Sequence, residues 1–125
     1  MSIAKRVAAK YQEISVGAVE RGVRTLAQKL GKLGLETDVE VFRTGPGGTQ
    51  HYGPSYVELT VRGKVRDEDG TEDEASSWVK FYAGGYAVGS RRQDISGVEG
   101  WKPMAARGLE VLFEDLKKQG WEPPK

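Results

Sequence analysis

His51 is the only histidine in the 125-residue sequence, and it lies in a glycine-rich segment, residues 45–54. An imidazole there could act as an acid or a base on a small ligand held by the loop. A single histidine excludes a two-histidine zinc site. The segment also has neither the Gly-Lys-Ser/Thr nor the Gly-x-Gly-x-x-Gly pattern of a phosphate-binding loop. We therefore predict a connection between strands with no catalytic residue and no cofactor, and keep a small-ligand enzyme using residues 45–54 as a third alternative.

An acidic segment, Asp67–Glu74, holds six of the 18 carboxylates. A calcium-binding EF-hand loop with Gly70 as its central glycine would need carboxylates at its first and twelfth positions. Those positions are Val65 and Ser76, so the sequence predicts neither a calcium site nor another metal site. We expect a solvated turn between two strands, which could shield a sheet edge or face a basic partner.

Basic residues are concentrated outside that segment, and residues 1–35 alone hold seven bases and two acids. Phosphate contacts from lysine and arginine, with aromatic rings for base stacking, are typical of nucleic-acid binding. The candidate phosphate-contacting residues are Lys5, Arg6, Lys10, Arg62, Lys64, Arg91 and Arg92. Nucleic-acid binding is the second function that we consider, although a pI near 7.9 is lower than that of most basic nucleic-acid-binding domains.

The length predicts one domain, residues 1–125, because single domains most often contain about 100 to 150 residues. The chain has no cysteine, which excludes disulfides and thiolate metal sites and favours a cytoplasmic location. No segment approaches the roughly 20 apolar residues of a membrane span, so we predict a soluble protein with no membrane partner.

A long amphipathic helix is predicted from Ile3 to Leu33, because apolar residues recur there at helical spacing. Ser2 would cap its start and Gly34 would follow its end. Such a helix would span about 46 Å, whereas a compact domain of this length is only about 36 Å across. Either the helix bends near Ser15 to Gly17, or residues 1–16 form a protruding arm that needs a partner.

Four strands are predicted after this helix, at residues 38–44, 56–65, 76–83 and 86–90, from the alternation of apolar and polar residues. Gly84–Gly85 suits a two-residue hairpin turn, which would place Phe81 opposite Val88. The register of the preceding hairpin stays open. A two-residue turn at Asp69–Gly70 would put Trp78 on the face of Val57, whereas an odd-length loop would put Val79 and Phe81 there.

A second helix is predicted at residues 103–118, with proline in its first turn and Gly120 at its end. Residues 121–125 would form a polar tail. The fold class is therefore α+β, with a long N-terminal helix, an antiparallel sheet of three or four strands and a C-terminal helix.

Two short stretches resemble known families. Gly53–Tyr56 leading into a strand, and Lys102–Ala106 opening the last helix, resemble the double-stranded RNA-binding domain. That family begins its final helix with a lysine pair, of which only Lys102 is present here. Tyr56–Glu58 with the later Lys102–Met104 resembles phage neck or tail-completion proteins of the head-tail connector type, which would imply a viral assembly role.

The leading prediction is a non-enzymatic protein-binding or assembly subunit. The apolar surface of the first helix and the aromatic residues of the sheet exceed what one small domain would cover. Its partner would be another protein or further copies of the chain. The predicted partner contacts are Ile3, Val7, Tyr11, Trp78 and Tyr82.

Overall fold

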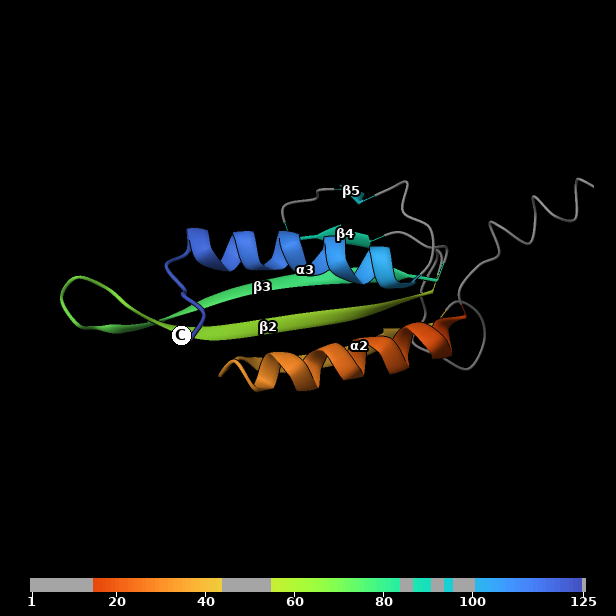
Figure 1. Ribbon diagram of the computed structural model, residues 1–125, viewed down its shortest axis with the longest axis horizontal. Helices are drawn as coiled ribbons and strands as arrows, with labels where there is room; N and C mark the ends of the chain where they lie inside the picture. Colours follow the sequence, from red (N-terminus) through yellow and green to blue (C-terminus); the bar gives the residue numbers. More distant parts are fainter. Residues whose placement is uncertain (1–14, 44–54, 84–86, 91–93, 96–100, 125) are drawn as a thin grey trace, which may run out of the picture.

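The computed structural model describes residues 15–43, 55–83, 87–90, 94–95 and 101–124. It confirms an α+β fold in which, along the chain, one helix precedes the strands of an antiparallel sheet and another follows them (Figure 1). The elements are α2 (Val16–Gly31), β1 (Glu36–Phe42), β2 (Tyr56–Arg66), β3 (Glu72–Tyr82), β4 (Ala87–Gly89), β5 (Asp94–Ile95) and α3 (Trp101–Lys118). The strands lie side by side in chain order, and the two-residue β5 adds a fifth strand to the predicted sheet.

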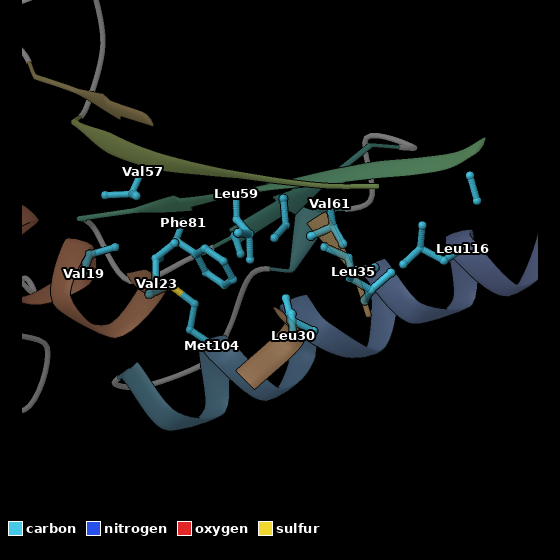
Figure 2. Packing of buried hydrophobic residues seen from close by; sticks show 14 of the residues in the cluster. Val19, Val23, Leu30, Leu35, Val57, Leu59, Val61, Phe81, Met104 and Leu116 are labelled. Carbon is cyan, nitrogen blue, oxygen red and sulfur yellow. The ribbon is translucent and has the colours of Figure 1, made fainter. Parts of the chain in front are cut away.

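Both helices pack on the same face of the sheet, and the core lies between the two layers (Figure 2). Helix α2 contacts mainly β1 and β2, while α3 contacts mainly β3 and β4. Alternate residues of the strands point toward the helices, as the period of two in a strand requires. The largest fully buried side chains are Phe81, Leu59, Met104, Leu112, Leu116, Val19, Val23, Val57, Val61 and Val79.

Helix α2 begins at Val16, because Ser15 has extended backbone angles and its hydroxyl accepts a hydrogen bond from the Ala18 amide. This is an N-cap, which satisfies one of the free amides at a helix start. A single continuous helix from Ile3 to Leu33 is therefore wrong, because the described helix starts at Val16, within the stretch from Ser15 to Gly17 where a bend was the predicted alternative. Residues 1–14, with the predicted Ser2 cap and most of the arm, lie outside the described residues.

Both helices end in the same way, with a glycine at positive φ: Gly34 at 82° after α2 and Gly120 at 102° after α3. In each case the next residue donates its amide back to a helix carbonyl, Leu35 to Leu30 and Trp121 to Leu116. These Schellman motifs confirm the two predicted helix ends.

The Schellman motifs also direct the following side chains inward, where Trp121 is only 5% exposed. The prediction that residues 121–125 form a polar tail is therefore wrong at its first residue. Leu35 and Trp121 meet over Gly63 of β2, where a Cβ atom would lie 2.8 Å from Leu35 Cδ2 and 2.6 Å from Trp121 Cδ1. The absence of a side chain at Gly63 leaves room for both residues.

The β2–β3 hairpin has the odd-length loop of the two predicted alternatives. Val57 pairs with Phe81 and Leu59 with Val79, so Val79 and Phe81 face the core. The Asp67 carboxylate causes this by accepting hydrogen bonds from the amides of Asp69 and Thr71, at 3.0 and 2.9 Å. A glycine at positive φ then completes the turn, as in three-residue hairpin loops.

The register of the next hairpin is not the one that a two-residue Gly84–Gly85 turn would give. Phe81 pairs with Ala87 and Lys80 with Val88, so the register differs by one residue from the prediction. One residue reverses the faces of a strand. Consequently Ala87 is buried in the core, and Val88 lies on the same side of the sheet as Lys80.

Replacement by alanine should have opposite effects on stability at two helical glycines, Gly108 and Gly31. A Cβ at Gly108 would lie 2.6 Å from Phe81 Cε1, whereas a Cβ at Gly31 would meet nothing within 4 Å. Gly108→Ala should therefore lower the free energy of unfolding by about 1–3 kcal/mol through overpacking. Gly31→Ala should raise it by about 0.4–1 kcal/mol by restricting the unfolded chain. Urea denaturation of both variants measures this, and a stabilised Gly108→Ala would contradict the close packing of α3 on β3.

Candidate protein-binding face

The sheet has an open face, which we define as the side turned away from α2 and α3. It carries the strand residues that alternate with the core residues, arranged in rows across β1, β2 and β3. The rows are Phe42–Tyr56–Tyr82, Glu40–Glu58–Lys80, Asp38–Thr60–Trp78 and Glu36–Arg62–Ser76. No helix or strand in the described ranges packs over this face.

The first row is aromatic across three strands. The rings of Phe42 and Tyr56 stack with centroids 4.7 Å apart, and those of Tyr56 and Tyr82 lie 5.1 Å apart in a tilted arrangement. Cross-strand aromatic pairs of this kind stabilise a sheet. Tyr56 in the centre is 6% exposed, while its two neighbours are half-buried.

Burial raises the pKa of the Tyr56 hydroxyl above its ordinary value, and the nearby Glu58 carboxylate raises it further. Tyr56 is therefore neutral throughout the physiological pH range. A neutral phenol in a low-dielectric setting is a hydrogen-bonding group rather than a general base.

Lys80 connects the aromatic row to Trp78. Its Nζ atom lies 5.1 Å from the centroid of the Tyr56 ring and 5.0 Å from that of Trp78. Both distances fall within the range of cation–π attraction, which is about 0.5–1 kcal/mol at exposed sites. Trp78 and Tyr82, which the sequence analysis singled out as partner contacts, thus lie on one surface with Lys80 between them.

Acidic residues dominate the remainder of the open face, especially along β1. Arg62 donates to Asp38 at 2.6 Å and lies 3.7 Å from Glu36. The hydrogen bond to Asp38 raises the pKa of the Arg62 guanidinium above its ordinary value. Arg62 is thus held by carboxylates and is poorly placed to contact phosphate.

The other predicted nucleic-acid-binding residues are not brought together in the described part of the chain. Lys64 is exposed on β2 and pairs across the sheet with Glu74. The remaining five lie outside the described residues: Lys5, Arg6, Lys10, Arg91 and Arg92. Of the predicted set, the two described residues are thus each placed beside or opposite carboxylates, Arg62 by Asp38 and Glu36 and Lys64 by Glu74.

Several predictions fall on segments that the structure does not describe. These are the partner contacts Ile3, Val7 and Tyr11, together with His51 and the whole of the glycine-rich segment, residues 45–54. Within the described ranges, no three carboxylate or other ligating side chains are grouped closely enough to hold a metal ion. Neither α2 nor α3 is long and apolar enough to cross a membrane.

A buried polar cluster between α3 and the sheet escaped the sequence analysis. Ser90 Oγ donates to Asp115 Oδ2 at 2.6 Å, and Ser77 Oγ lies 3.0 Å from Ser90 Oγ. Because the single proton of Ser90 goes to the carboxylate, Ser77 must be the donor to Ser90. Asp115 and Ser77 are 7% and 3% exposed. The sequence did contain a signal for it. Leu112 and Leu116 belong to the apolar stripe of the helix, and Asp115 lies next to Leu116, at the border of that stripe.

This cluster joins α3, β3 and the residue that follows β4. Within the described residues no imidazole lies beside either serine, and Ser77 is almost inaccessible to solvent. Gln119 strengthens the same junction. Its amide donates to the Ser76 carbonyl at 2.7 Å and accepts from the Ser76 amide at 2.9 Å. It thereby satisfies backbone groups of β3 beyond the short stretch that pairs with β4.

No model of a protein family, no curated protein sequence and no solved structure matches the chain.

Proposed function

We propose that the chain is a non-enzymatic protein-binding or assembly subunit that contacts its partner through the open face around Trp78, Lys80 and Tyr82. The observation that supports this most is the placement of both helices on the other side of the sheet, which leaves the half-buried Trp78 on the open face. Tryptophan and tyrosine are enriched among the residues that contribute most of the binding energy at protein–protein interfaces.

The N-terminal segment adds to this proposal from the sequence alone. Ile3, Val7 and Tyr11 recur at helical spacing, and an amphipathic segment of this kind offers a second apolar contact to a partner. The proposed partner is another protein or further copies of the chain.

Site-specific photo-crosslinking tests the proposal. A benzophenone amino acid at position 78 should give a discrete crosslinked product, whereas the same group at Arg107 on the exposed surface of α3 should not. A product of twice the chain mass would identify self-assembly, and another discrete mass would identify a foreign protein. Equal yields from positions 78 and 107 would contradict the proposal.

A matched variant tests the chemistry of the face. Lys80→Glu should reduce the crosslink from position 78, because it removes the cation that lies between the Trp78 and Tyr56 rings and places a carboxylate opposite Glu58. Binding to duplex RNA or DNA at low salt serves as the contrasting measurement. A strong, steeply salt-dependent interaction would favour the nucleic-acid function instead.

A further inference from the structure

We infer that the outer edge of β1 binds an extended peptide segment in which basic and apolar residues alternate, so that the segment adds a strand to the sheet. This inference concerns the sheet edge rather than the aromatic face, so it can hold or fail independently of the proposed function. It rests on three observations: the position of β1 in the sheet, a groove beside it and the charges along it.

The first observation is that β1 is an edge strand. The strand order places it at one end of the sheet, and β2 is its only strand partner in the described ranges. Alternate residues of its seven-residue length, Glu36–Phe42, therefore direct their amide and carbonyl groups outward. The outward-facing backbone groups of an edge strand are a template for a further strand.

The second observation is an open groove of about 450 Å³ between this edge and α2. It is lined by Arg24, Ala27, Gln28, Thr37, Asp38 and Val39. A strand added to β1 would direct every second side chain toward this groove. Its lining is mostly polar and includes the apolar side chains of Ala27 and Val39. Recognition by strand addition uses this division: backbone hydrogen bonds give affinity, and pockets for alternate side chains give specificity.

The third observation is the charge on the other side of the added strand. Glu36, Asp38 and Glu40 all face the open side of β1, and Glu58 lies opposite Glu40 on β2. The described cations in these rows are Arg62, which contacts Asp38 and lies near Glu36, and Lys80, which pairs with Glu58 across the sheet. The four carboxylates thus outnumber the two cations. The side chains of an added strand that face this side would therefore be favoured if they were lysine or arginine.

The same charges argue against a second copy of the chain as the occupant. An antiparallel pairing of two β1 edges that keeps the faces aligned would set Asp38 opposite Asp38 and Glu36 opposite Glu40. Like charges directly opposite each other destabilise strand pairing. Charge repulsion thus disfavours pairing of two β1 edges, and the same charges favour a segment that carries basic residues.

The test uses the full chain and a capped nine-residue peptide in which valine and lysine alternate. Titration monitored by amide chemical shifts should perturb Glu36–Val41 and the residues of α2 that line the groove. A peptide of the same composition with the valines grouped at one end should bind at least tenfold more weakly, since its lysines would not align with the β1 carboxylates. Equal binding of both peptides would overturn the inference.

Backbone methylation of the peptide separates strand addition from simple charge attraction. Methyl groups on the amides of one alternate set should weaken binding at least tenfold, because those amides face the β1 edge. Methyl groups on the other set face solvent and should change binding little. Strand addition is excluded if methylation of neither set of amides weakens binding, or if methylation of each set weakens it equally. Concentration-dependent dimerisation that perturbs the same β1 amides would also overturn the inference.

Discussion

Phe81→Ala is expected to lower the free energy of unfolding by about 3–5 kcal/mol, the usual cost of deleting a fully buried phenylalanine. Phe81 is completely buried, lies against Gly108 of α3 and has its ring centroid 5.4 Å from that of Trp101. Because a domain of this size is stable by only about 5–15 kcal/mol, the variant should lose a large part of its stability. Equilibrium urea denaturation followed by circular dichroism measures the loss.

Trp78→Ala is the matched control for this experiment, because Trp78 is the larger side chain and lies three residues earlier in the same strand. It points to the open face, is only half-buried and has its ring beside Lys80, so its removal should cost about 1–2 kcal/mol. If the two costs were reversed, the β2–β3 register would be the other alternative, with Trp78 in the core.

Trp121→Ala is expected to lower the free energy of unfolding by about 3–5 kcal/mol as well. The Trp121 ring stacks on that of Phe113 at 5.8 Å and fills the space over Gly63. Deleting residues 122–125 is the control. Residues 122–124 are exposed, so this deletion should change stability by no more than about 0.5 kcal/mol. Similar small effects of both changes would show that the C-terminal segment does not belong to the core.

The sequence was sufficient for features that depend on local periodicity and on glycine chemistry. The alternation of Val57, Leu59 and Val61 located the core face of β2, and the glycines at 34 and 120 located both helix ends. The aromatic residues Trp78 and Tyr82 were expected on a common surface because they are two positions from Lys80 on either side. These patterns need no information about distant contacts.

The remainder depended on contacts between segments that are distant in the sequence or on loop geometry. The β2–β3 register follows from hydrogen bonds to the Asp67 carboxylate, which select one turn among several that the residues allow. Trp121 lies in the core because Gly120 reverses the chain toward Gly63, and nothing near Trp121 indicates this partner. The charge along β1 was visible in the sequence, but its exposure at a sheet edge required the strand order.

The length of the β2–β3 hairpin has a further consequence for how the domain opens. Both strands contain 11 residues, and the hairpin extends past the helices that cover its other end (Figure 1). Around Leu59 and Val79 the backbone amides are covered by the core, so their exchange with solvent requires unfolding of the whole domain. Toward Asp67 and Thr71 the side chains are exposed, and amides there exchange through local fraying. The β2–β3 pairing near the acidic turn can therefore open and close again while the pairing at the other end of the hairpin, around Tyr56 and Tyr82, stays intact.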